Sequence, residues 1–147
     1  RLANVYGPRN YSGPIPTFFK RLSAGQECTV TDTRRDTVFV DDLLELVLAA
    51  LDQGETGKFD VCSGQAYPIR FYYDAVAGAL GGAPDPAMVP APAGDVAEME
   101  LDPIPAAATF GWRATTPLTR GIAETVAWYQ VHGVGDTYSH LRLGAAG

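Results

Sequence analysis

Two adjacent arginines, Arg34 and Arg35, are the residues whose type and spacing best suit ligand chemistry in this sequence. A guanidinium is always charged and carries a fork of N–H donors, so it suits a diphosphate held at the end of a strand. The alternation TVFV follows directly and predicts such a strand. The alternative is a surface ion pair such as Arg35 with Asp36, which composition alone favours. From the residues alone, both interpretations stay open.

Asp41 and Asp42 are the second adjacent pair of chemically capable groups. Paired carboxylates can share acid–base work. Two acids at the start of a helix, however, also satisfy free N–H groups and the helix dipole. Asp42 and Glu45 have the spacing of a capping box. We therefore expect these acids to cap a helix.

The remaining reactive side chains are expected to be structural. Cys28 and Cys62 fall in predicted strands, where a buried, unreactive thiol is the usual state. Two cysteines make neither a disulfide framework nor a metal site, which predicts a reduced, cytoplasmic protein. His132 and His140 lack metal-ligand spacing, so we expect ordinary surface or helix-end residues. The sequence contains no glycine-rich phosphate loop and no Tyr followed four residues later by Lys.

Strand and helix signals alternate along the chain and must position these groups. The expected strands are residues 1–7, 28–32, 35–42 and 58–64, and the expected helices are residues 15–25, 41–54, 67–82 and 116–133. Thr116 is expected to cap the last helix. Residues 83–95 contain four prolines and predict an extended loop. This alternation predicts an α/β fold.

Composition and charge limit the possible partners. The chain has 147 residues, enough for one compact domain, with 46% hydrophobic and 19% charged residues. Its net charge of −6 divides into +3 over residues 1–40 and −9 over the rest. An acidic chain with no apolar run of membrane-spanning length argues against nucleic acid and membranes as partners. The basic first part leaves room for a small anionic ligand.

Several separated motifs, taken in order, resemble the C-terminal half of the extended short-chain dehydrogenase/reductases, and more narrowly the nucleotide-sugar epimerases and dehydratases. The motifs are RLANVYGPRN, IPTFFKRLSAG, RRDTVFVDDLLELVLAAL, KFDVCSG, GDVAEMELDPIPAAATFGW and PLTRGIAETVAWY. The resemblance covers residues 1–129 and leaves 130–147 as a C-terminal tail. It implies the last Rossmann strands and helices plus a small α/β substrate-binding domain, without the N-terminal Rossmann half.

The resemblance implies that Arg35 binds the diphosphate and that Asn4 contacts the diphosphate or the sugar. Asp95 would lie on the same substrate side. Many relatives carry a second phosphate-binding arginine just before this aspartate, where residues 91–93 here are Ala-Pro-Ala. Leu2 and Ala3 would pass beside the nicotinamide end of the cofactor.

The resemblance also implies which residues surround the base. Ile15 and Pro16 match the loop that covers the nucleotide. Thr29 and Thr31 match the short strand that packs on the nucleobase. Relatives usually carry an aromatic residue near Thr31, where this chain has a hydroxyl.

The intact enzyme implied by the resemblance uses NAD or NADP to oxidise a sugar hydroxyl transiently. It would act on a UDP- or dTDP-sugar and form a homodimer. The family's glycine-rich loop and its Tyr-x-x-x-Lys pair precede the first motif. We therefore expect a fragment that alone holds no cofactor and is inactive, the nucleotide-sugar-binding portion of an epimerase or dehydratase, with a lean toward UDP-sugar 4-epimerase. The alternatives are a non-catalytic nucleotide-sugar-binding module or degenerate paralogue, and one piece of a nicked enzyme.

Overall fold

The structure is a computed structural model and describes residues 1–137. In chain order its elements are β1 (Asn4–Tyr6), α1 (Pro14–Ser23), β2 (Thr29–Thr31), β3 (Arg34–Phe39), α2 (Val40–Gln53), β4 (Ala66–Pro68), α3 (Ile69–Ala79), β5 (Ala87–Val89), β6 (Glu98–Met99), α4 (Ile104–Phe110) and α5 (Leu118–His132). The predicted α/β fold is confirmed. Among the described residues, no helix is long and apolar enough to cross a membrane.

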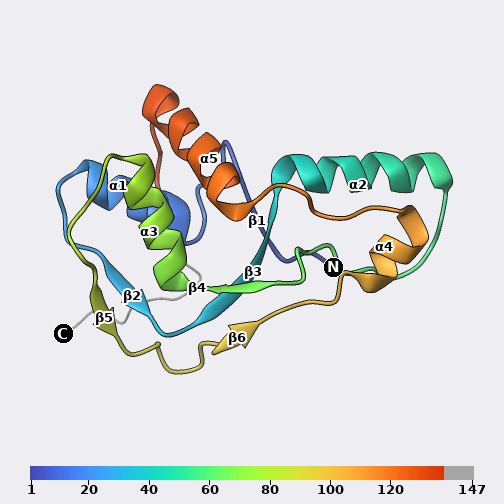
Figure 1. The fold of residues 1–147 in the computed structure, drawn as a ribbon, viewed down its shortest axis with the longest axis horizontal. Coiled ribbons are helices and arrows are strands. Elements are labelled where there is room, and N and C mark those ends of the chain that lie inside the picture. Colours follow the sequence, from blue (N-terminus) through green and yellow to red (C-terminus); the bar gives the residue numbers. More distant parts are fainter. Residues whose placement is uncertain (138–147) are drawn as a thin grey trace.

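β3 is the strand around which the others are arranged (Figure 1). It pairs in parallel with β1 near one end and with β6 near the other, and antiparallel with β4. β2 and β5 form a separate parallel pair. The register of β1 places Asn4 opposite Thr37, two residues along β3 from Arg35.

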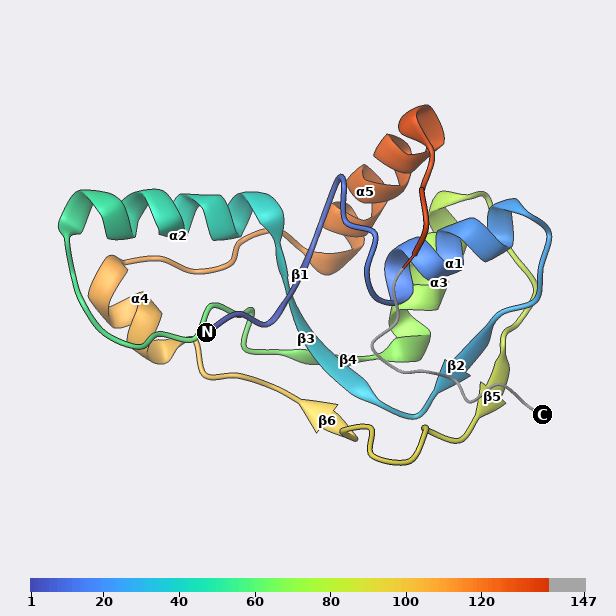
Figure 2. The same cartoon turned by 180° about the vertical axis from the view of Figure 1, so that it is seen from behind.

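Two hydrophobic clusters lie on the two faces of β3. The larger one packs α1, α3 and α5 together, and Phe39 belongs to it. The smaller one lies between α2 and α4, and Val38 belongs to it. Figure 2 shows the same division, with α2 and α4 at one end of the molecule and the other three long helices at the opposite end. Neighbouring residues of a strand point to opposite faces, so Phe39 and Val38 let β3 serve both clusters.

The helix caps expected at Asp42, Glu45 and Thr116 are wrong. α2 begins at Val40, directly after β3, and no side chain caps it. The Asp42 carboxylate turns inward and accepts hydrogen bonds from the backbone N–H groups of Thr115 and Thr116, at 3.2 and 3.1 Å. α5 begins after Pro117, also without a side-chain cap. Asp42 therefore ties α2 to the segment that leads into α5.

Other expectations were incomplete at the short elements. Strand β5 lies within the segment expected to be a loop. Further along the chain, after β6, α4 forms where no helix was expected. The strand expected at 58–64 is reduced to one bridge, between Val61 and Leu2. α5 continues to His132, past the start of the expected tail at 130, and the His132 ring stacks on Trp128. His140 lies outside the described residues.

Candidate functional site

Arg35 sits where β3 meets the segment that follows β5. Its Nη1 donates to the backbone oxygens of Arg34 and Val96, at 2.8 and 2.7 Å. Its Nη2 donates to Oδ1 of Asp95 at 2.6 Å. The guanidinium thus uses three of its five N–H donors within the described residues and has two without a partner there.

Asp95, not Asp36, is the ion-pair partner of Arg35, so the pairing suggested by adjacency is wrong. The side chains of Arg35 and Asp95 are 15% and 11% exposed, which makes this a largely buried pair at the edge of the site. Asp95 Oδ1 also accepts from the N–H of Val96 at 2.9 Å, which fixes the turn of this segment. Two of the predicted substrate residues therefore lie in direct contact.

Arg34 points elsewhere, although it is the neighbour of Arg35 in the sequence. Its Nε donates to Glu98 at 3.1 Å and its Nη2 to the backbone oxygen of Ala66 at 2.7 Å. Arg34 is nearly half exposed and holds β3 to β6 and β4. Of the two arginines, only Arg35 is part of the candidate site.

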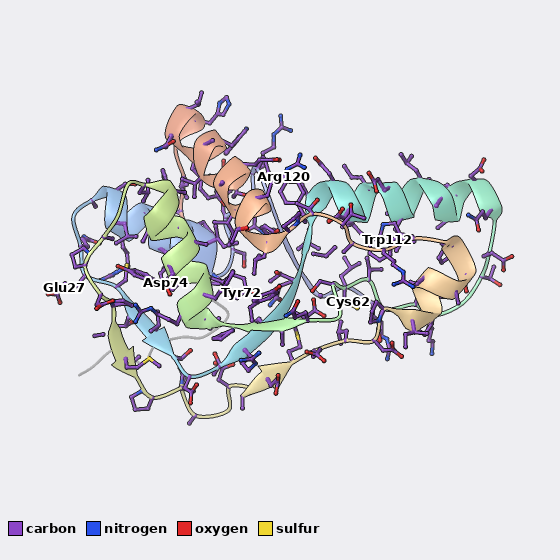
Figure 3. All side chains as sticks on the ribbon, in the orientation of Figure 1. Glu27, Cys62, Tyr72, Asp74, Trp112 and Arg120 are labelled. Atoms are coloured by element: carbon purple, nitrogen blue, oxygen red, sulfur yellow. The ribbon has the colours of Figure 1, made fainter. Side chains whose placement is uncertain are left out.

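Tyr72 holds the backbone of Arg35 through a hydrogen bond. This tyrosine lies on α3 (Figure 3) and is fully buried. Its hydroxyl donates to the backbone oxygen of Arg35 at 2.7 Å. Burial raises the pKa of Tyr72 to about 12, so the hydroxyl remains a donor at neutral pH. Tyr72 therefore fixes the backbone that carries the guanidinium.

Asp36 holds the other side of the same strand. Its side chain is completely buried and accepts from the N–H and hydroxyl of Ser63 and from the N–H of Gly64, at 2.7 to 3.0 Å. A buried carboxylate is stable only when donors surround it in this way. Asp36 thereby fixes the loop after Val61 against β3.

The predicted residues of β1 lie along the strand next to Arg35. Asn4 is exposed at the start of β1, while Ala3 is buried and Leu2 is exposed. One strand spacing and two residues separate Asn4 from Arg35, a Cα distance of about 8 Å. The two side chains are thus close enough to contact one diphosphate-sugar.

The four residues expected around the base lie on two elements, α1 and β2. Ile15 and Pro16 lie in the first turn of α1, not in a loop, and both are buried, Ile15 in the larger cluster. Thr29 is exposed on β2. The Thr31 hydroxyl lies 2.9 Å from that of Thr33, so it already has a partner in the turn between β2 and β3. Of the four, the two threonines are accessible, and Ile15 and Pro16 can act only by shaping α1.

The cysteines are buried and free, as expected. Burial raises the pKa of the Cys62 thiol to about 11, with a further contribution from Asp36. Burial also raises the pKa of Cys28. Neither thiol is therefore activated as a nucleophile. In residues 1–137, no group of three or more His, Cys, Asp or Glu side chains could hold a metal ion.

Sequence reasoning missed Tyr72 and Asp36 as residues that hold the site, and Asp42 as the residue that ties α2 to the segment leading into α5. Each acts through a partner more than 25 residues away along the chain, which spacing cannot reveal. The available signal was the position of Asp36 in a predicted strand, directly after Arg35. An acid expected to be buried needs donors from elsewhere in the fold.

Known proteins match this chain over nearly its whole length. The model of the NAD dependent epimerase/dehydratase family matches residues 1–62. The UDP-glucose 4-epimerase of Mycolicibacterium smegmatis is 35% identical over 137 residues, 87% of this chain and 44% of that protein. The Bordetella bronchiseptica enzyme WbmG, solved with NAD and UDP, is 42% identical with a TM-score of 0.86, over 96% of this chain and 46% of its own.

The UDP-glucose 4-epimerase of Thermotoga maritima, solved with UDP-glucose, is 28% identical with a TM-score of 0.80, over 90% of this chain and 45% of its own. The chain thus spans less than half the length of these relatives. With the α/β fold built around β3, these similarities show that the chain belongs to the NAD-dependent epimerase/dehydratase family of extended short-chain dehydrogenase/reductases.

Proposed function

We propose that this chain is the nucleotide-sugar-binding part of an NAD- or NADP-dependent epimerase or dehydratase, with UDP-sugar 4-epimerisation as the preferred reaction. The observation that carries the proposal is the Arg35 guanidinium, pinned by Asp95 and by the backbone of Val96 with two donors left. A second support is that relatives were solved with UDP and with UDP-glucose.

In this proposal the chain acts by positioning. Arg35 binds the diphosphate through a fixed guanidinium that needs little reorganisation, because Tyr72 and Asp95 already hold it. Asn4, about 8 Å away along β1, contacts the diphosphate or the sugar. The sugar is then directed toward Leu2 and Ala3, where the nicotinamide would lie.

The residues of this chain do not fit a complete site for NAD or NADP. Leu2 and Ala3 offer apolar side chains and backbone, and neither can bind the phosphates or riboses of a dinucleotide. The cofactor, when bound, supplies reversible hydride transfer at a sugar carbon. We therefore propose that residues outside this sequence hold it, and that the chain alone is inactive.

The decisive test is calorimetry with UDP and UDP-glucose on the wild type, Arg35→Ala and Arg34→Ala. A charge-assisted hydrogen bond to phosphate contributes about 1.5–3 kcal/mol, so Arg35→Ala should weaken binding about 10- to 100-fold. Arg34→Ala is the matched control, because it removes the same charge one residue along the chain. The Arg34 side chain is bound to Glu98 and is not part of the candidate site.

Arg34→Ala should change the affinity by less than about 3-fold, in line with the small value of an exposed ion pair. Circular dichroism checks that both variants keep the fold. Equal affinities of the wild type and Arg35→Ala would refute the phosphate assignment. Equal losses in both variants would show a general charge effect and refute it as well.

A further inference from the structure

Tyr67 lies directly across from Arg35 in the sheet. The register of the antiparallel pair β3–β4 matches Arg35 with Tyr67. The side chains of two residues paired in this way stand on the same face of the sheet, with their Cβ atoms about 4.5–5.5 Å apart. Tyr67 is only partly buried, so part of its side chain reaches solvent next to Arg35. The candidate site thus has an aromatic neighbour that the predicted site residues do not include.

The Tyr67 ring is held from two directions. Its centroid lies 4.8 Å from that of Phe71, with 39° between the ring planes. Its hydroxyl donates to Oε1 of Gln65 at 2.8 Å. Phe71 belongs to the first turn of α3, which begins directly after β4 (Figure 1). A ring fixed in this way loses little conformational freedom when a ligand stacks on it.

Tyr67 and Asn4 lie on opposite sides of Arg35. The strand order is β1-β3-β4, so Asn4 is at one edge of β3 and Tyr67 is at the other. Asn4 pairs with Thr37, which is two residues from Arg35 and therefore points to the same face. The side chains of Asn4, Arg35 and Tyr67 thus share one face. Strand spacing and rise place the Cα atoms of Asn4 and Tyr67 about 12 Å apart.

A nucleotide-sugar has its parts in the same order, because its diphosphate lies between the sugar and the nucleoside. In the proposed function the diphosphate is on Arg35 and the sugar is toward Asn4. The nucleoside then extends to the other edge of β3, where Tyr67 lies. The strand expected near the base, β2, has the sequence Thr-Val-Thr and offers no ring. An aromatic surface for the base is therefore present at Tyr67 and absent from β2.

We propose that Tyr67 binds the nucleobase of the substrate by stacking, with Phe71 holding the tyrosine ring in place. Every base has a flat π face, so an aromatic side chain contributes affinity without reading hydrogen-bonding groups. The diphosphate on Arg35 and the base on Tyr67 fix the nucleotide at two points, which orients the sugar toward Asn4. This inference rests on the proposed function, because it requires the diphosphate on Arg35.

The test is calorimetry on the 147-residue chain with UDP, UDP-glucose and inorganic pyrophosphate, which is a diphosphate without a base. Tyr67→Leu removes the π face and keeps apolar bulk. Tyr67→Phe keeps the ring and removes the hydrogen bond to Gln65. Tyr11→Leu is the matched control, because Tyr11 is also a partly buried tyrosine in an aromatic pair, with Trp128 on α5. Thermal unfolding shows whether each variant keeps the fold.

Tyr67→Leu should weaken the binding of UDP and of UDP-glucose by the same factor, about 5- to 100-fold, the range produced by loss of one base–aromatic stack. Tyr67→Phe and Tyr11→Leu should each change these affinities by less than about 2-fold, because both keep the Tyr67 ring or its phenyl equivalent. Pyrophosphate affinity should be the same in all three variants and should fall in Arg35→Ala, since only the guanidinium binds the diphosphate.

Proton NMR of bound UDP supplies a direct readout that a merely structural role of Tyr67 would not move. The uracil H5 and H6 signals should shift upfield on binding to the wild type and to Tyr67→Phe, because the ring current shields protons that lie over an aromatic face. The shift should be lost in Tyr67→Leu. Absence of the upfield shift in the wild type would overturn the proposal even if Tyr67→Leu does not fold.

Unchanged UDP affinity in Tyr67→Leu would also overturn the proposal. A loss confined to UDP-glucose would place the sugar on the ring, and an equal loss for pyrophosphate would show that Tyr67 acts only through Arg35. A loss of the same size in Tyr67→Phe would assign the effect to the hydroxyl and Gln65. Each of these three results contradicts stacking of the base. Failure of the proposed function looks different, because Arg35→Ala then leaves the affinities for all three ligands unchanged.

Discussion

The candidate site depends on single buried polar groups whose partners come from distant parts of the chain. Arg35 is held at its backbone by Tyr72 and at its guanidinium by Asp95, 37 and 60 residues away. The sequence predicted the chemistry of Arg35 from its type, and the family resemblance predicted its role. The sequence could not predict the role of Tyr72, because the apolar spacing of a helix face does not indicate which group one hydroxyl will bond.

Asp42 is the residue for which the structure changes the expectation most. Asp42→Asn should lower the free energy of unfolding by about 2–4 kcal/mol, because an amide NH₂ then faces the N–H donors of Thr115 and Thr116. Urea denaturation measures this loss. Asp41→Asn is the control. Asp41 is exposed in the first turn of α2, so its change should cost at most about 1 kcal/mol. Similar costs for both would restore a simple capping role.

At the scale of elements, the long helices and the strands β1, β2 and β3 were predictable, and the short strands β4, β5 and β6 were not. α2 and α5 show apolar spacing over 14 and 15 residues, which local sequence is enough to indicate. β4, β5 and β6 have two or three residues each and exist because β2 or β3 offers an edge to pair with. Such pairing is a tertiary effect that no short window of sequence contains.

The packing of α5 on the strands depends on Gly121. A Cβ built there would meet Tyr6 Oη and lie 2.9 Å from Cδ2 of Phe39. Gly121→Ala should therefore destabilise the chain by about 1–3 kcal/mol, although alanine favours helices. Gly78→Ala in α3 has nothing within 4 Å and should stabilise by about 0.5–1 kcal/mol. Opposite signs in urea denaturation are the expected result. Stabilisation by both changes would mean that α5 does not pack closely on β1.

At the scale of the whole molecule, acids from later in the chain pair with three of the early arginines. Arg1 pairs with Asp60, Arg34 with Glu98 and Arg35 with Asp95. The small anionic ligand for which composition leaves room stays a prediction, and Arg35 has two N–H donors without a partner among the described residues. Net charge could not show this, because pairing depends on the fold.

The two hydrophobic clusters should also differ in stability. The cluster around α2 has six buried apolar residues against fifteen in the other, and α2 leaves Leu44, Leu48 and Leu51 exposed. Cys28 lies in the larger cluster, and Cys62 directly follows Val61 of the smaller one. Fewer buried contacts lower the free energy of local opening.

Thiol alkylation in increasing urea, read by peptide mass spectrometry, reports the two ends separately in the unmodified chain. Both thiols are buried with raised pKa values, so each reacts only after its surroundings open. Cys62 should therefore be alkylated at a lower urea concentration than Cys28. Coincident midpoints would show a single cooperative unit and contradict this order.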